Sequence, residues 1–347
     1  LMSDEPFLAA DNVSYVGQPV VVIAAETEAA LNRAIAAVEI DVDPLPPVLS
    51  VRDAIEQEQF IGPRRTIARG DADAAIKSAT HTLAGEFQIG GQEQFYLESQ
   101  SAIAFPGEQD QLVIHSSTQN TTEIQAMVSE VFSLPMHNIV CICKRMGGAF
   151  GGKETQAVIP ALMVAMVARR TGRAARIVYD KDTDMQVTGK RHEYLCAWSV
   201  GFDDAGRIDG LACDFWSNGG AAADLSTSVM ERTLLHAENC YYIPHARFRG
   251  QVCKTNVPPN TAFRGFGGPQ AVAAMENIIE RVAESLDLDA FDVRMANLYG
   301  ADDRNTTPYG QLFTGNHLPE IMETLAERSD YRKRVAELPQ RNATDPL

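Results

Sequence analysis

A glycine-rich segment, Lys144 to Thr155, carries the residues with the clearest chemical potential. Four glycines surround Phe150, between a stretch typical of a strand and one typical of a helix. Such turns bring backbone N–H groups close to an anionic ligand, and a following helix favours negative charge. Gly147 to Lys153 matches the core of a phosphate-binding loop, but Glu154 stands where Ser or Thr would coordinate magnesium. The segment therefore predicts an anion-binding turn, and a nucleotide-binding module remains one alternative.

A second Phe-Gly-Gly sequence repeats the pattern. Phe150 and Phe266 each precede two glycines and a predicted helix, and Pro269 suits the first position of the second helix. That helix has a core-facing stripe of Val272, Met275, Ile279, Val282 and Leu286. The repetition favours two turns that converge on one anionic ligand. The alternative is that the glycines serve only the geometry of tight turns.

Composition and charge restrict the class of protein. The 347 residues are 45% hydrophobic and 22% charged, which is typical of one large or two ordinary globular domains. A formal net charge of −16 argues against a nucleic-acid surface. The longest apolar run, Pro160 to Ala168, is far shorter than the roughly twenty residues that cross a bilayer. The first residues lack a signal-peptide pattern. We expect a cytoplasmic protein with no membrane segment and no nucleic-acid partner.

Cysteines and histidines do not show the spacing of a protein-ligated metal site. Cys141 and Cys143 alternate along a predicted strand and so share a face; we favour small core residues over a soft metal pair. The other cysteines have strand-like surroundings and no C-x-x-C spacing, so we expect reduced thiols. No histidine has a second histidine four residues away, so the sequence does not indicate a protein-ligated zinc site. The remaining cysteines are Cys196, Cys213, Cys240 and Cys253.

The chain divides near residue 57. Gly17 to Val42 has the pattern of a β-α-β unit, with a strand at Val20 to Ala24, a helix capped by Thr27, and a second strand at Glu39 to Val42. We interpret residues 1–56 as the remnant of a domain, because so short a stretch forms little core alone. A polar connection from Gln57 to Arg69 then leads into a larger domain, residues 57–347.

The larger region alternates strands and helices without a regular βα repeat, so we predict an α+β fold with mixed sheets and packed helices. Pro160 separates the first turn of the helix after the glycine-rich turn from its apolar body. The predicted strands are Thr82–Ile89, Gln111–His115, Asn138–Lys144, Ala174–Tyr179, Tyr194–Phe202 and Ile208–Trp216. The predicted helices are Asn120–Phe132, Pro269–Leu286, Ala290–Tyr299 and Pro319–Leu338.

Four motifs in order resemble the molybdenum-binding part of the xanthine oxidase/xanthine dehydrogenase family. They are Gly90–Glu98, the glycine-rich turn, Val229–His236, and Cys253–Asn256 with Asn260–Gln270. The resemblance runs from near residue 4 to the end of the chain. It implies that residues 1–56 are the C-terminal part of an α/β hammerhead domain. Residues 57–347 would then be the first molybdopterin-binding domain.

The resemblance also implies a cofactor and its contacts. In this family the dithiolene of a pyranopterin holds the molybdenum ion, and protein side chains supply few direct bonds. Gln92 would reach the ligands on the metal, and the backbone amides of Phe150 and Arg264 would line the cofactor and metal, beside Gly148 and Gly151. Without the motif, Gln92 is a buried polar group at a strand end and Phe150 is a core aromatic.

Three residues determine the substrate class that the resemblance implies. Glu154 would hydrogen-bond a purine, Arg232 would offset negative charge on its oxygens, and Phe266 would stack on its ring. Aldehyde-oxidising relatives lack the charged pair, so we expect xanthine or hypoxanthine, with an aldehyde or another N-heterocycle as alternative. Without the motif, Glu154 complements a helix dipole, Arg232 is a surface or salt-bridged arginine, and Phe266 packs in the core.

The implied reaction is attack of a molybdenum-bound hydroxide on an electron-poor carbon, with hydride passing to a sulfido ligand. Electrons would leave through 2Fe-2S centres to FAD, with NAD or oxygen as final acceptor. The general base is expected beyond residue 347, and the cysteine clusters for iron–sulfur centres are not in this sequence. We therefore expect a part of a dimeric assembly, inactive alone, whose partners are the remaining molybdenum-binding domain and the iron–sulfur and FAD portions.

Overall fold

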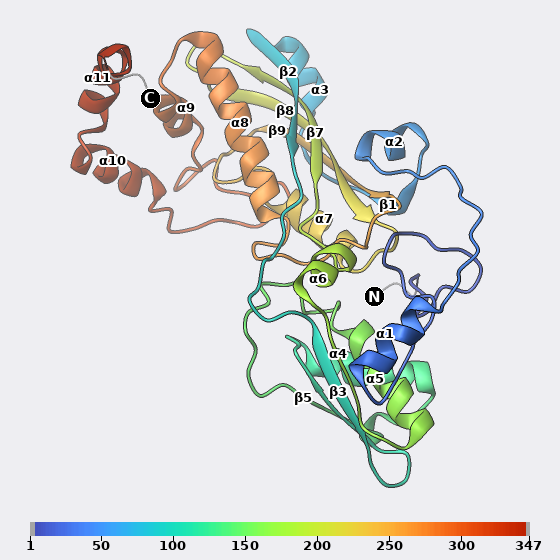
Figure 1. Ribbon diagram of the computed structural model, residues 1–347. Coiled ribbons are helices and arrows are strands. Elements are labelled where there is room, and N and C mark those ends of the chain that lie inside the picture. Colours follow the sequence, from blue (N-terminus) through green and yellow to red (C-terminus); the bar gives the residue numbers. More distant parts are fainter. Residues whose placement is uncertain (1–3, 345–347) are drawn as a thin grey trace.

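Two mixed sheets organise the chain, in agreement with the predicted α+β class. The computed structural model describes residues 4–344. The first three residues, on which the absence of a signal-peptide pattern partly rests, lie outside the described range. Figure 1 shows one sheet with its helices at each end of the molecule and the short helix α6 (Lys181–Val187) between them. Within the described range, no helix is long and apolar enough to cross a membrane.

The five-stranded sheet carries the larger core. Its order is β1-β9-β8-β7-β2, and β8 and β9 are parallel while the other neighbours are antiparallel. The strands are Phe60–Arg69, His245–Lys254, Ile208–Gly220, Tyr194–Phe202 and His81–Ile89 in that order. Helix α8 (Gly268–Leu286) packs on this sheet as predicted, because Met275, Ile279 and Val282 of its apolar stripe are buried. Helices α7 (Ser226–Leu235) and α9 (Ala290–Asn297) complete this core.

The four-stranded sheet forms a separate core. Its order is β5 (Ile139–Ile142), β4 (Leu112–Ser116), β3 (Ser101–Pro106) and β6 (Ala175–Val178), with β4 and β5 parallel. Helices α4 (Thr121–Phe132) and α5 (Val158–Thr171) cover one face, where alternate residues of β3 and β4 are buried. Helix α5 is continuous, and the predicted separate first turn is wrong. Pro160 lies within that first turn, where the missing N–H has no helical partner to lose.

The predicted β-α-β unit near the amino end is only partly correct. Helix α1 (Glu28–Ala36) has the predicted cap, because the Thr27 side chain accepts a hydrogen bond from the Ala30 amide. Residues 20–24 and 39–42, however, are not strands. Strands require hydrogen bonds to a neighbour, and no strand lies beside these residues within the described chain. The segment continues to helix α2 (Val51–Glu56).

Two other predictions about elements are corrected. The supposed connection Gln57–Arg69 contains β1, an edge strand whose register shifts between Ile61 and Arg65, so Gly62 and Pro63 lie at an irregularity. The predicted helix Pro319–Leu338 is two helices, α10 (Leu318–Arg328) and α11 (Tyr331–Thr344). Asp330 separates them because its φ of 51° is left-handed. Strands β3 and β9, and helices α3 (Ala72–Ser78), α6 and α7, were not predicted.

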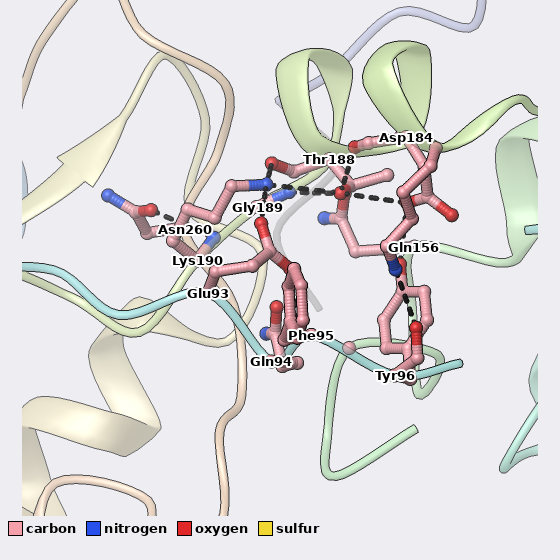
Figure 2. A network of polar contacts seen from close by, with 12 residues as sticks. Glu93, Gln94, Phe95, Tyr96, Gln156, Asp184, Thr188, Gly189, Lys190 and Asn260 are labelled. Atoms are coloured by element: carbon pink, nitrogen blue, oxygen red, sulfur yellow. Dashed lines mark hydrogen bonds and ion pairs between the residues drawn. The ribbon is translucent and has the colours of Figure 1, made fainter. Parts of the chain in front are cut away.

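A buried carboxylate joins the two crossings between the sheets. Asp184 of α6 is 2% exposed and accepts hydrogen bonds from the Tyr96 hydroxyl (2.6 Å) and the Thr188 hydroxyl (3.2 Å), three residues that Figure 2 labels. It also accepts a hydrogen bond from the Gln100 amide (2.6 Å). Tyr96 and Gln100 belong to the segment from β2 to β3, whereas Asp184 and Thr188 belong to that from β6 to β7. This carboxylate therefore fixes both connections to each other.

The same network extends toward the five-stranded sheet. The Lys190 ammonium forms an ion pair with Glu93 at 2.8 Å and donates to the Thr188 carbonyl at 2.7 Å (Figure 2). The Lys190 amide donates to the Asn260 side chain at 3.0 Å, and the Gly189 amide to that of Gln156 at 3.1 Å. These bonds hold the crossing segments, the glycine-rich region and the loop before α8 in one arrangement.

Replacing Asp184 tests how far the joint between the sheets depends on this carboxylate. Asp184→Ala leaves a buried amide and a buried hydroxyl without their acceptor, so the free energy of unfolding should fall by about 3 kcal/mol. Asp182→Ala, an exposed acid in the first turn of the same helix, should cost about 1 kcal/mol or less. Urea unfolding measures both. Equal losses would contradict a joint centred on Asp184.

Alanine at Gly151 tests the packing between the two glycine-rich turns. Gly151 has φ of 107°, and a Cβ there would lie 2.6 Å from the Ala262 carbonyl oxygen. Gly151→Ala should therefore cost about 3 kcal/mol or more. The control is Gly172→Ala, with φ of 69° and no atom within 4 Å, which should cost about 1 kcal/mol. Similar losses for both variants, measured by urea unfolding, would argue against tight contact between the turns.

Candidate functional site

The two Phe-Gly-Gly turns lie against each other, as the sequence predicted. The Arg264 amide donates to the Phe150 carbonyl at 2.8 Å. Phe150 and Phe266 both have left-handed backbone, with φ of 55° and 50°. Large side chains rarely adopt this conformation, and strained residues of this kind cluster at ligand sites. The contact makes the junction of the turns the candidate site.

The first turn does not have the geometry of a phosphate-binding loop. Lys153 is fully buried, and its ammonium donates to the Glu98 carbonyl (2.5 Å) and the Ser117 hydroxyl (2.7 Å). Burial lowers its pKa. Helix α5 begins only at Val158, so Glu154 lies in a turn before the helix and not in its first turn. The lysine is used inside the protein, and the nucleotide-binding alternative does not fit this arrangement.

Several backbone amides of the turns are occupied within the protein. Gln119 accepts hydrogen bonds from the Gly151 amide (2.8 Å) and the Lys153 amide (3.4 Å). The Arg264 amide, expected to line the cofactor, is occupied by Phe150. The Phe150 amide has no hydrogen-bond acceptor among residues 4–344. Of the two amides predicted to face the cofactor, that of Phe150 is therefore available.

Arg191, which sequence reasoning did not select, links the predicted residues. Its Nε donates to Gln92 Oε1 at 3.0 Å and its Nη2 to the Arg264 carbonyl at 3.0 Å. The guanidinium lies 3.9 Å from the centre of the Phe263 ring. Gln92 is exposed after β2, so it is not the satisfied buried group that its position alone suggested. No motif or periodicity in the sequence distinguishes Arg191 from other arginines.

Asp224 holds three site elements together and was also missed. One of its oxygens accepts from the Thr261 hydroxyl at 2.7 Å, and the other from the Thr155 hydroxyl at 2.8 Å and the Gln156 side chain at 2.7 Å. Burial raises its pKa, while these three bonds oppose the rise. Asp224 stands just before α7, so it fixes that helix relative to both glycine-rich turns.

The predicted substrate residues lie on these joined elements. Arg232 is exposed in the last turn of α7. The Thr233 hydroxyl of the same helix donates to the Gly267 carbonyl at 3.2 Å. Gly267 follows Phe266, which is half-buried. Glu154, partly buried, immediately precedes Thr155, which bonds to Asp224. Neither the Glu154 carboxylate nor the Arg232 guanidinium has a hydrogen bond or ion pair within the described residues.

The neighbouring Glu231 is not the partner of Arg232. It pairs with Arg65 at 3.1 Å, with both side chains about half exposed. Of the two structural alternatives, a salt-bridged arginine does not describe Arg232, whereas a surface arginine agrees with its exposed side chain. Its guanidinium remains available to a ligand.

The cysteine pair differs from the expected pair of core residues. Cys141 packs partly against the core of the four-stranded sheet, but Cys143 follows the end of β5 and bonds weakly to the Arg145 carbonyl at 3.8 Å. All six thiols are free. Within residues 4–344, no group of three or more His, Cys, Asp or Glu side chains is arranged to hold a metal ion.

Comparisons with known proteins show what this chain is similar to. The family model "Molybdopterin cofactor-binding domain" matches residues 55–298. A nicotinate hydroxylase of Emericella nidulans is 41% identical over 99% of this chain and 26% of its own length. A xanthine dehydrogenase/oxidase of Felis catus is 40% identical over 96% of this chain and 25% of its own. The chain therefore spans about a quarter of the length of these relatives.

Solved structures share the fold. An aldehyde oxidoreductase from Desulfovibrio gigas superposes with a TM-score of 0.84 at 26% identity, over 95% of this chain and 37% of that one. Quinoline 2-oxidoreductase from Pseudomonas putida 86 gives 0.86 at 24% identity, over 97% and 45%, and shows the fold alone. The family match and the identity to xanthine dehydrogenases over nearly the whole chain show that the chain belongs to the xanthine dehydrogenase family and contains its molybdopterin cofactor-binding domain.

Proposed function

We propose that this chain forms one wall of the active site in a molybdenum hydroxylase that oxidises a purine, xanthine or hypoxanthine. The observation that carries the proposal is the pair of unpartnered charged side chains, Glu154 and Arg232, on elements that Asp224 joins. The 40% identity to a xanthine dehydrogenase/oxidase supports it. Glu154 is partly buried and Arg232 is exposed, so both charged groups are accessible to a ligand.

The donors at the junction fit the molybdenum cofactor. Arg191 Nη1 is buried without a hydrogen-bond partner in the described chain, and the Phe150 amide is also free. Gln92 uses only its oxygen internally, which leaves its NH2 group for a ligand. The ligands on the metal and the pterin offer mainly acceptors, so Gln92, Phe150 and Arg191 match them, with Gly148, Gly151 and Arg264 completing the wall.

The residues of this chain would bind and polarise the substrate. When bound, the cofactor supplies the oxygen transfer and accepts two electrons. Phe266 would stack on the purine ring, Glu154 would hydrogen-bond a ring nitrogen, and Arg232 would stabilise the negative charge that grows on an exocyclic oxygen. Such electrostatic stabilisation in a water-poor site is worth several kcal/mol. We place the general base outside this chain.

The remaining parts of the reaction belong to other portions of the assembly in this proposal. The chain spans about a quarter of its relatives, so 2Fe-2S centres, FAD and the rest of the molybdenum-binding region would come from elsewhere. NAD or oxygen would be the final acceptor, and the complete enzyme would be a cytoplasmic dimer. Residues 1–56 would be the end of a hammerhead domain. The isolated chain would be inactive, because it holds only one wall of the site.

A pyridine carboxylate is the second candidate substrate. The nicotinate hydroxylase of Emericella nidulans is as similar to this chain as the xanthine dehydrogenases are. Arg232 suits the carboxylate of such a substrate, because a guanidinium forms two parallel hydrogen bonds with a carboxylate. Glu154, in contrast, would face a second negative charge. The two substrates therefore place opposite demands on Glu154.

Substitution of the charged pair tests the purine proposal in the complete enzyme. Glu154→Ala and Arg232→Ala should each lower kcat/KM for xanthine by about a hundredfold, because each removes an interaction with developing charge. Activity on an aromatic aldehyde should change by less than about threefold. Glu231→Ala, which removes only the surface pair with Arg65, is the control and should leave both activities unchanged. Full xanthine activity in both variants would refute the roles of Glu154 and Arg232.

Nicotinate distinguishes the two candidates. If the enzyme is a pyridine-carboxylate hydroxylase, wild type should turn over nicotinate faster than xanthine. Arg232→Ala should then raise the KM for nicotinate about tenfold or more through loss of the bidentate contact, while Glu154→Ala should lower it, because a carboxylate that repels the substrate is removed. Steady-state kinetics with both substrates measure this. A wild type that oxidises xanthine and not nicotinate would exclude the second candidate.

A further inference from the structure

Arg191 is a buried charge without a carboxylate partner. The side chain is 8% exposed, and none of the ion pairs within residues 4–344 includes it. The neighbouring Lys190 is paired with Glu93, and burial together with Arg191 lowers the pKa of His192 to about 3, so that ring is neutral. Removing a guanidinium from water costs several kcal/mol unless an anion or a full set of acceptors compensates it. The chain has a formal net charge of −16, yet no carboxylate of the described residues forms an ion pair with Arg191.

The hydrogen bonds of Arg191 account for only part of its donors. Nε and Nη2 reach Gln92 Oε1 and the Arg264 carbonyl, each at 3.0 Å. Nη1 is buried and has no acceptor in the described chain. It points into the region of the second turn, since a Cβ on Gly265 would lie 3.9 Å from it. One donor of a buried cation is therefore left for a group that the protein does not supply.

The same contacts fix the orientation of the Gln92 amide. An arginine nitrogen can only donate, so the atom of Gln92 that meets Nε must be the oxygen. The NH2 group of Gln92 then points away from Arg191, and no protein acceptor within residues 4–344 receives it. The backbone supports this alignment, because the Arg191 amide donates to the Gln92 carbonyl at 2.9 Å. The orientation of the amide is therefore fixed with its NH2 group unoccupied.

We infer that Arg191 is a positioning residue of the molybdenum site. It sets the Gln92 amide so that NH2 faces the ligands on the metal, and it directs Nη1 at an anionic atom of the bound cofactor. The contact of its guanidinium with the Phe263 ring, 3.9 Å from Cζ to the ring centre, restricts the movement of the guanidinium. This inference rests on the cofactor part of the proposed function and is independent of the identity of the substrate.

The test uses the complete enzyme with Arg191→Met and Arg191→Lys. Arg191→Met should lower molybdenum and pterin content per protomer about tenfold, as loss of groups that support metal ligands commonly does. Arg191→Lys keeps the positive charge but lacks the planar set of guanidinium donors, so it should retain more cofactor than Arg191→Met. Its kcat should fall about tenfold with less than about twofold change in KM, because the Gln92 amide is no longer fixed.

A spectroscopic readout separates positioning from a merely structural role. After partial reduction with dithionite, the electron paramagnetic resonance spectrum of the molybdenum centre should change in Arg191→Lys. Iron, flavin and melting temperature should remain as in wild type. Arg294→Met is the control, because Arg294 is held by Glu276 and Glu280 (2.9 and 2.6 Å). It should destabilise the protein without changing molybdenum content or the spectrum.

Wild-type cofactor content, spectrum and kcat in both Arg191 variants would overturn the inference. If Arg191→Met does not accumulate as folded enzyme, Gln92→Glu tests the same arrangement, since it keeps the acceptor for Arg191, removes the NH2 donors and places a negative charge where they stood. An unchanged spectrum and kcat in that variant would also overturn it. A wild type that contains molybdenum but does not oxidise xanthine would contradict the purine proposal alone, because the spectrum needs no substrate.

Discussion

The close contact between two backbone turns is the constraint on which the rest of the site depends. Gly151 packs so near the Ala262 carbonyl that a side chain cannot fit, and the Arg264 amide completes the contact with Phe150. The first turn follows β5 of one sheet, and the second precedes α8 on the other. The candidate site therefore lies where the two cores meet, and its geometry depends on how both are fixed.

Buried polar groups fix that junction in two different ways. Asp184 and Asp224 are satisfied within the protein, each by three hydrogen-bond donors, and they hold crossing segments, turns and helix α7 in register. The Lys153 ammonium likewise donates its hydrogen bonds to acceptors within the protein. Arg191 differs because one of its donors stays without a partner. A satisfied network gives rigidity, whereas in our proposal the free donor of Arg191 is left for a ligand.

Local patterns predicted some elements well and others poorly. Helix α8 and strand β7 follow the expected residues closely, since a sustained apolar stripe and a short apolar strand between polar turns have few competing interpretations. Strand β1 looked like a polar connection, because an edge strand exposes one face and tolerates Pro63 at an irregularity. Residues 20–24 have strand composition but no partner strand, and pairing is not a local property.

The sequence by itself determined the family, because four motifs in order identify it, and it placed Gln92, Phe150, Glu154, Arg232, Arg264 and Phe266 in those motifs. It also showed that Glu154 occupies the position where a phosphate-binding loop has the Ser or Thr that coordinates magnesium. Only the tertiary structure revealed that Lys153 is buried, that Glu154 and Arg232 lack internal partners, and that Asp224 and Arg191 join the site. The reason is physical: motifs record which side chains are present, whereas hydrogen bonds between segments far apart in the chain decide which of them remain free for a ligand.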